Sequence, residues 1–331
     1  MSDTVDATAT VQSGSSVVRN FFKTLFSDYG FLVILLAMVI ISYLLEPAFL
    51  TPRNLMNVFR QMSITTIIAF GTTLVIIAGM IDLCTGSLAA LTGVVGTMIY
   101  VATGSVVLGL LGGLAVGAVA GIINGFFITR FDLPPFIVTL AMMTGARGTV
   151  LLITGGKPVI NIGDFTILGQ GYLFGIPIPI LIMFAVFLVM TVLLKKTKLG
   201  RYTYAIGGNQ DAAVASGINV TRIKIVIFII AGLCTGLAGV LLMSRINSGQ
   251  PSAGLMYELD AITAVVVGGT SLSGGGGTML GTLVGGLIVA ILQNILNLTN
   301  VSPYWQQILK GAVIVLAVVM DQITKAKKKG K

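Results

Sequence analysis

The chain has 331 residues, of which 55% are hydrophobic and only 9% are charged, and its mean hydropathy is +1.00. A soluble domain carries roughly 25% charged residues, so the composition excludes most water-soluble folds. The 42 glycines exceed the usual share of about 7%, and glycine at this level in apolar sequence is typical of helices that pack closely in a bilayer. The composition predicts an all-α, polytopic transmembrane bundle.

The residue types exclude several kinds of site. The chain contains no histidine, which rules out a histidine general base and a histidine-ligated metal. Cys84 and Cys234 lie far apart in apolar sequence, so we expect small buried side chains and neither a disulfide nor a metal site. The net charge of +9 includes a C-terminal lysine tail without interleaved aromatic residues, which favours a cytoplasmic anchor over nucleic-acid binding.

Apolar segments long enough to cross a bilayer recur along the chain. A span needs about 20 mostly apolar residues, and we expect spans near 29–45, 62–80, 85–103, 106–128, 135–154, 177–194, 224–243, 259–271, 278–297 and 304–320. These make about ten spans. Glycines interrupt 62–103 and 259–297, where each break divides two spans or marks a re-entrant loop. Residues 29–321 are the expected membrane domain, with a disordered cytoplasmic tail at 1–28 and a basic tail at 322–331.

The distribution of basic residues predicts that both termini are cytoplasmic. With the N-terminus inside, the cytoplasmic segments hold Arg19, Lys23, Arg130, Lys195, Lys196, Lys198, Arg201, Arg222, Lys224 and the tail lysines. The opposite side holds Arg53, Arg60, Lys157 and Arg245. This asymmetry follows the positive-inside rule and requires an even number of spans. Arg147 and Lys310 fall within spans, and we expect them to lie near helix ends, where their charged heads snorkel or meet a helix C-terminus.

Glycines mark expected packing faces and breaks. Helix-packing spacing occurs at Gly113, Gly117, Gly121 and Gly125, at Gly232 and Gly236, and at Gly281 and Gly285. The spacing is typical of close structural packing or of a mobile, pore-lining interface. Two similar strings, VIIAG from Val75 and VVVGG from Val265, suggest a weak internal repeat. We expect the glycine-containing stretches 79–86 and 268–277 to be kinked and to serve as gates.

Polar residues within the spans are candidates for a polar pathway. An ionisable group in a bilayer costs at least about 2.5–3.5 kcal/mol, and Asp82 either caps the helix that follows it or has a gating role. The remaining pathway candidates are Gly86, Ser87, Asn124, Gln293, Asn294 and Asn297. Such uncharged groups can hydrogen-bond a hydroxyl-rich solute or bridge neighbouring helices.

The connection at about 195–224 is the longest and most polar of the predicted cytoplasmic segments. Within it, DAAVAS from Asp211 favours a helix, with GGN before it and Gly217 after it. Asparagine and glycine are typical of helix starts and ends. The pattern predicts a short capped helix along the membrane face that docks into a cleft of another protein; an ordinary surface loop is the alternative. The chain has no phosphate loop, because Gly156-Lys157 runs into Pro158, so any ATP hydrolysis requires another chain.

The segment GRYTYAIGGNQDAAVASGINV from Gly200 resembles the coupling loop of permeases from bacterial sugar-importing ABC transporters, the ribose, galactose and xylose group. Other matching strings are NLMNVFRQMSI from Asn54, GMIDLCTGSLAALTG from Gly79, GIINGFFITRFDLPPFIVTLAMMTGARG from Gly121, SGQPSAGLMYELDAITAVVVGGTSLSGG from Ser248 and SPYWQQILKGAVIVLAVVMDQ from Ser302. The resemblance covers residues 30–321. Met80 and Cys84 depart from the family's usual Gly-Ile-Asp-Leu-Ser string. The strings GYLFGIPIPI and SGQPSAG favour ribose, with galactose and xylose as alternatives.

The resemblance implies a homodimeric permease of the bacterial inner membrane, with ATP-binding subunits beneath it and a periplasmic or lipid-anchored sugar-binding protein above it. The partner ATPase would use ATP and magnesium, and this chain would bind no cofactor or metal. The residues implied in coupling to the ATPase are Gly200, Arg201, Gly207, Gly208, Asn209, Asp211, Ala212, Ala213 and Gly217. The candidates for receptor docking, or alternatively for anchoring at lipid headgroups, are Arg53, Arg60, Arg245 and Glu258.

Other functional classes remain as alternatives at this point. An ion-coupled secondary transporter of a small polar solute would require an essential intramembrane carboxylate, for which Asp82 and Asp260 are the candidates. A membrane enzyme is disfavoured, because the sequence offers no histidine, metal cluster or paired carboxylates. A membrane receptor or scaffold without transport activity is the last alternative.

Overall fold

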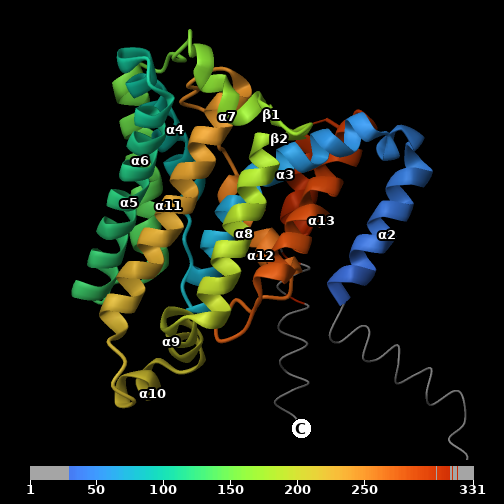
Figure 1. Ribbon diagram of the computed structural model, residues 1–331. Helices are drawn as coiled ribbons and strands as arrows, with labels where there is room; N and C mark the ends of the chain where they lie inside the picture. The colour runs from blue at the N-terminus through green and yellow to red at the C-terminus, as the bar shows by residue number, and fades with distance from the viewer. Residues whose placement is uncertain (1–29, 303, 314, 316–318, 320–331) are drawn as a thin grey trace, which may run out of the picture.

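The structure is a computed structural model that describes residues 30–302, 304–313, 315 and 319 (Figure 1). The predicted tails at 1–28 and 322–331 lie outside the described residues. The described chain is a bundle of helices with one small hairpin, in which β1 (Tyr172–Leu173) pairs antiparallel with β2 (Ile176–Pro177). The predicted all-α class is confirmed.

Seven of the described helices are long and apolar enough to cross a membrane. They are α3 (Pro52–Ile77), α4 (Thr85–Thr103), α5 (Val106–Arg130), α6 (Pro135–Thr154), α8 (Ile178–Lys196), α11 (Val220–Ile246) and α13 (Met279–Leu298). The shorter elements are α2 (Gly30–Leu45), η1 (Pro47–Leu50), η2 (Gly163–Thr166), α7 (Ile167–Gln170), α9 (Lys198–Gly208), α10 (Gln210–Ala215) and α12 (Tyr257–Val267). Residues 304–313, which lie outside the expected tails, are also helical. The protein is therefore a multi-pass membrane protein.

The predicted span at 259–271 is wrong. Helix α12 has 11 residues, which at 1.5 Å per residue extend about 16 Å, roughly half of a hydrocarbon core of about 30 Å. The helix ends because Gly269 adopts a left-handed backbone with φ +85°. The helix predicted at 62–80 instead begins at Pro52, since proline suits the first helical position.

Glycine contacts hold the centre of the bundle together. Helix α11 packs against α5, α4 and α3. Gly117 of α5 and Gly232 of α11 lie backbone to backbone, because a Cβ on either residue would collide with the carbonyl oxygen of the other. Gly121 and Gly125 also face backbone atoms of α11. The glycine face of α5 is therefore a tight packing surface.

Figure 1 shows what lies at the two ends of the bundle. The start of α2, the helices α9 and α10 and the loop after α12 lie at the lower end. The hairpin, η2 and α7 lie at the upper end. The predicted cytoplasmic termini themselves belong to the residues that the structure does not describe, so the location of the termini stays a prediction.

Two of the non-helical segments are residues 78–84 before α4 and residues 247–256 before α12. The segments meet where the two helices begin, because a Cβ on Gly86 would collide with the Gly254 carbonyl oxygen and with the Glu258 carboxylate. We call this contact the break crossing, formed by Gly86, Gly254 and Glu258. Helices α4 and α12 therefore begin next to each other.

The two strings of the suggested internal repeat end their helices in the same way. The Met80 N–H donates to the Val75 carbonyl at 3.0 Å, and the Thr270 N–H donates to the Val265 carbonyl at 3.1 Å. In the first of these helix ends, Gly79 has a left-handed backbone with φ +76°. A left-handed glycine followed by this hydrogen bond is a Schellman motif. The similarity of the strings thus corresponds to matching helix ends.

Candidate functional site

Helices α9 and α10 form a segment that extends beyond the lower end of the bundle (Figure 1). Asn209 caps α10, because its Oδ1 accepts the Ala212 N–H at 2.9 Å. At the other end Gly217 has φ +80°, and the Ile218 N–H donates to the Ala213 carbonyl at 3.1 Å. The predicted short helix therefore exists, with the expected residues at both caps.

Most of the surface of α10 is exposed. Asp211, Ala212 and Val214 are exposed, and Val214 exposes 57% of its surface. Ala213 is buried, so it anchors the short helix to the rest of the segment. Helix α10 is thus anchored at Ala213 and exposes an apolar and acidic face.

The two adjacent glycines of the segment have different surroundings. A Cβ on Gly207 would collide with the carbonyl oxygen of Ile77, at the end of α3. A Cβ on Gly208 would meet nothing within 4 Å. Gly200 is also enclosed, against the carbonyl oxygen of Leu194, whereas Arg201 is exposed. Gly207 is thus the glycine that lets α9 touch α3.

The glycine loop after α12 completes this contact. The Gly275 N–H donates to the Ile77 carbonyl at 2.8 Å, and the Tyr204 hydroxyl of α9 donates to the Gly277 carbonyl at 2.7 Å. Burial raises the pKa of Tyr204, so the hydroxyl stays protonated and able to donate. We call Ile77, Gly207 and Gly275 the glycine junction; it joins α9 to the end of α3 and to the loop after α12.

Polar side chains surround the start of α4. Asp82 is buried and its Oδ1 accepts the Cys84 N–H at 2.9 Å, which is a local capping contact. Asn124 of α5 reaches the same place, with its Nδ2 at 3.4 Å from the Cys84 Sγ. Ser87 is buried one turn along. Among the described residues, Thr85 Oγ1 and Asn124 Oδ1 are buried without a hydrogen-bond partner.

Arg147 holds the segment that leads into α12. Its Nη1 donates to the carbonyl oxygens of Pro251 and Ala253. The expectation that Arg147 reaches a helix end is therefore wrong. The guanidinium instead satisfies carbonyl groups of residues 247–256, which have no helical partners in a bilayer.

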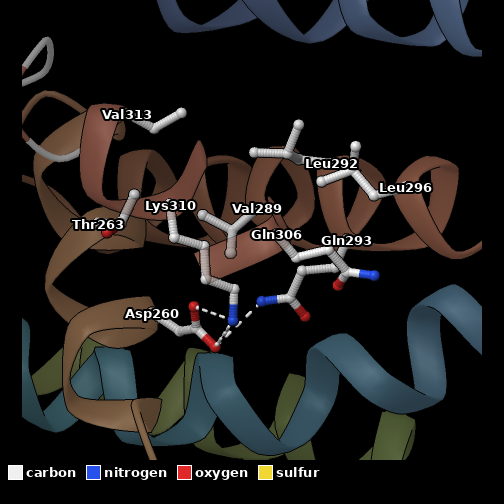
Figure 2. A pocket seen from close by; sticks show the side chains of 9 residues that line it. All are labelled: Asp260, Thr263, Val289, Leu292, Gln293, Leu296, Gln306, Lys310 and Val313. Carbon is white, nitrogen blue, oxygen red and sulfur yellow. Dashed lines mark hydrogen bonds and ion pairs between the residues drawn. The ribbon is translucent and has the colours of Figure 1, made fainter. Parts of the chain in front are cut away.

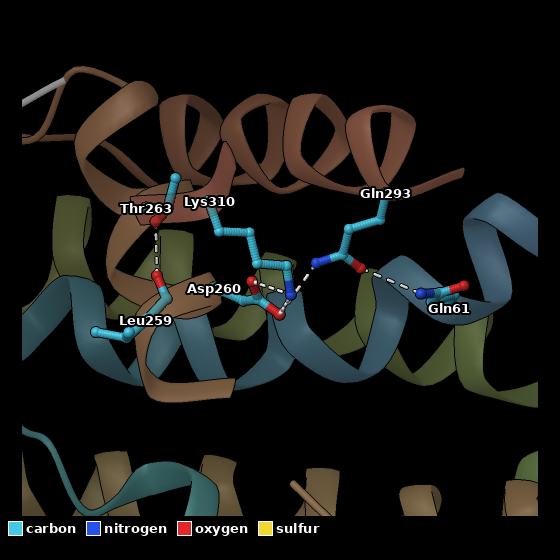
Figure 3. A network of polar contacts seen from close by, with 6 residues as sticks. All are labelled: Gln61, Leu259, Asp260, Thr263, Gln293 and Lys310. Atoms are coloured by element: carbon cyan, nitrogen blue, oxygen red, sulfur yellow. Dashed lines mark hydrogen bonds and ion pairs between the residues drawn. The ribbon is translucent and has the colours of Figure 1, made fainter. Parts of the chain in front are cut away.

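An ion pair lies between α12 and residues 304–313 (Figure 2). The Lys310 Nζ contacts the Asp260 Oδ1 at 2.9 Å and the Oδ2 at 3.0 Å. Gln293 Nε2 donates to the same Oδ2 at 3.0 Å, and Gln61 Nε2 donates to the Gln293 Oε1 at 3.1 Å (Figure 3). The Lys310 ammonium therefore neither snorkels nor meets a helix C-terminus; it pairs with the buried carboxylate of Asp260 in the first turn of α12.

The other amides predicted on the pathway also contact neighbouring helices. Asn294 exchanges hydrogen bonds of 2.9 Å with Asn54 of α3. Asn297 Oδ1 accepts from Gln306 at 2.9 Å. In this conformation the amides of α13 bridge neighbouring helices. The other role predicted for them is hydrogen bonding to a hydroxyl-rich solute.

A family model described as "Branched-chain amino acid transport system / permease component" matches residues 54–318. The chain belongs to this permease family. It is 47% identical to the ribose import permease protein RbsC of Bacillus subtilis (strain 168), over 92% of this chain and 95% of the relative. It is 44% identical to the RbsC of Escherichia coli (strain K12), over 92% and 96%, and 40% identical to the L-arabinose ABC transporter permease AraH of Azospirillum brasilense, over 88% and 87%. No solved structure matches the chain.

Three of the residues predicted to dock the receptor lie away from α9 and α10 in this permease. Arg53 is exposed near the start of α3. Arg60 lies over the Tyr172 ring of the hairpin, 5.0 Å from its centroid, and Arg245 ends α11 beside Gly169 of α7. The fourth, Glu258, lies against Gly86 at the break crossing.

The residues that sequence reasoning missed in this permease are those paired over long separations. The sequence favours Asp260 only as the carboxylate of an ion-coupled carrier, and it places the partner Lys310 near a helix end. An acid and a base in apolar segments are themselves a signal, since opposite charges in a bilayer tend to pair. Gln61 carried no local signal, because a single amide on a helix does not identify its partner.

Proposed function

We propose that the chain is the membrane-spanning permease subunit of an ABC importer of ribose in the bacterial inner membrane. The observation that carries this proposal is the identity of 47% to a ribose import permease over 92% of the chain. The exposed, capped helix α10 supports it, because a transport subunit without a phosphate loop requires a contact with a separate ATPase.

In this proposal the ATP-binding subunit docks on α10 and Arg201 and uses ATP and magnesium. The coupling residues are those predicted from the sequence, with Gly207 and Gly208 now distinguished by their surroundings. The chain itself contributes no catalytic residue. Force from the ATPase would reach the end of α3 and the loop after α12 through the glycine junction.

The polar pathway would run beside the break crossing, with Asp82, Ser87 and Asn124 near it. A second copy of the chain would pack against the outer face of α6, where Cβ atoms on Gly145 and Gly148 would meet nothing within 4 Å. Small residues of this kind let membrane helices approach closely. The sugar-binding protein would dock at the opposite end, near Arg53, Arg60 and Arg245.

The test is ATPase activity of the complex purified from the native host. We expect the purified chain alone to hydrolyse no ATP, and its complex with an ATP-binding subunit to hydrolyse ATP faster when the ribose-loaded binding protein is added. Galactose, xylose, arabinose and allose, each with its loaded binding protein, serve as the comparison. Stimulation by another sugar instead of ribose would contradict the choice of substrate, and failure of any ATPase to co-purify would contradict the importer.

A further inference from the structure

The ion pair of Asp260 and Lys310 joins segments that come from different parts of the chain. Asp260 lies in the first turns of α12 and exposes 5% of its side chain, whereas Lys310 exposes 22%. The same network reaches α13 through Gln293 and α3 through Gln61 (Figure 3). It is the one salt bridge found within the described part of the chain.

Helices α12 and α13 behave as one unit in this network. A Cβ on Gly285 would collide with the Ala264 carbonyl oxygen, and a Cβ on Gly281 would collide with that of Gly268. The bond from Gln293 to Asp260 therefore lies inside a closely packed pair of helices. Lys310 and Gln61 are the members of the network that tie this pair to its neighbours.

Stability alone does not explain why charges occupy this place. Removing two charges from water is costly, and apolar replacements of a buried ion pair are often neutral or stabilising. A buried pair is instead well suited to fixing the register of one element against another. Such a device suits the α12–α13 pair, because α12 is short, non-helical residues precede it and a glycine turn follows it.

The register of α12 determines the break crossing. Glu258, two positions before Asp260 on the same helix, lies against Gly86 of α4. A shift of α12 by one residue would move the helix by about 1.5 Å along its axis. Gly86 and Glu258 now lie so close that a Cβ on Gly86 does not fit, so a shift of this size would separate them. The side of the pair that faces Lys310 borders a cavity between α12, α13 and residues 304–313 (Figure 2).

We propose that Asp260 and Lys310 form an ionic latch that holds α12 in register and thereby keeps the break crossing closed. The latch rests on the proposed transport function only for its physiological purpose, because its effect on the crossing is a property of the permease alone. Asp260 and Lys310 are positioning residues in this proposal, and they need not touch the sugar.

The test measures how fast a membrane-permeant maleimide labels Ser87→Cys in the purified full-length permease, with the labelling of the native Cys84 and Cys234 measured in parallel. Ser87 follows Gly86 and is buried, so its labelling reports opening of the crossing. The variants are Asp260→Asn, Lys310→Met and the reversed pair Asp260→Lys with Lys310→Asp. Thr263→Val is the matched control, because Thr263 borders the same cavity but, among the described residues, donates only to the Leu259 carbonyl of its own helix.

We expect each single variant to label at least about fivefold faster, because local opening sets the accessibility of a buried group. The reversed pair should return labelling to near the parent rate. The side-chain amides of Gln293 and Gln61 can flip, so that the Gln293 oxygen instead of its nitrogen faces position 260. Thr263→Val should match the parent. Equal labelling in all variants, or a reversed pair that labels as fast as the single variants, would overturn the latch. This assay needs neither ATPase nor sugar, so it is decided separately from the proposed function.

Discussion

Gly207 and Ile77 approach so closely that no side chain fits between them. A Cβ on Gly207 would collide with the Ile77 carbonyl oxygen, and the same oxygen accepts the Gly275 N–H at 2.8 Å. One carbonyl group thus joins the end of α3, the segment α9–α10 and the loop after α12. Helix α9 is therefore in direct backbone contact with the end of α3 and with the loop after α12.

The glycine junction predicts different effects for two adjacent glycines. Gly207→Ala should reduce ribose uptake per ATP hydrolysed by about tenfold or more, because the methyl group forces α9 away from α3 and overpacking costs about 1–3 kcal/mol. Gly208→Ala is the matched control and should transport normally, since its methyl group meets open space. Uptake and ATPase rates of the reconstituted complex provide the measurement. Equal behaviour of the two variants would show that the junction does not transmit coupling.

Ala213→Pro should abolish docking of the ATPase. The Ala213 N–H donates to the Asn209 carbonyl at 3.0 Å, and proline removes this donor and clashes with the preceding turn, at a cost of about 3 kcal/mol or more in a helix. The measurement is the amount of ATP-binding subunit that co-purifies with the permease. Val214→Ala, a change on the exposed face that keeps the helix, should lower co-purification less. Full co-purification of the proline variant would exclude α10 as the docking element.

Tyr204→Phe should destabilise the lower end of the bundle by about 1 kcal/mol, the usual net contribution of one hydrogen bond. The pKa of Tyr204 is raised by burial. The folded state therefore favours the neutral phenol, and this contribution is present below the unfolded pKa of about 10 and is lost as the pH rises through the folded value. Thermal unfolding at about pH 7 and pH 9 should show the same loss of stability at both values. Tyr202→Phe, whose hydroxyl bonds to none of the described residues, should leave the melting temperature unchanged; an equal loss there would contradict the assignment.

The proposed dimer predicts a cross-link between two copies of α6. Gly148→Cys places a thiol on the face where Cβ atoms meet open space, and a disulfide forms when two Cα atoms lie within about 7 Å. Mild oxidation in native membranes should yield a dimer band on a non-reducing gel. Leu36→Cys on α2, which is 64% exposed at its native leucine, should remain largely monomeric. Cross-linking at position 36 instead of 148 would move the interface to α2.

Local patterns in the sequence predicted the locally determined features well. Asn209 and Gly217 identified the caps of α10, because a cap depends on a few neighbouring residues. The four-residue spacing of Gly117 and Gly121 identified a packing face, although it did not name α11 as the partner. Helix α12 is shorter than a full span because Gly269, with its positive φ, ends the helix within a continuous apolar run.

Long-range contacts could not be read in the same way. Gly207 and Gly208 are indistinguishable in sequence, and only the position of Ile77 separates an enclosed glycine from an open one. Lys310 resembled a snorkelling residue because Asp260 precedes it by many residues, and pairing across that separation is set by the bundle. Glu258 looked like a surface acid near a loop, but the break crossing places it against Gly86.

The most direct test of the proposed ABC importer function is uptake of labelled ribose into vesicles. The vesicles contain the permease, its ATP-binding subunit and, on the opposite side, the ribose-binding protein. We predict accumulation that requires ATP on the α10 side and persists when ionophores collapse all ion gradients. Uptake that survives removal of ATP but stops with the ion gradients would contradict the importer and favour an ion-coupled carrier.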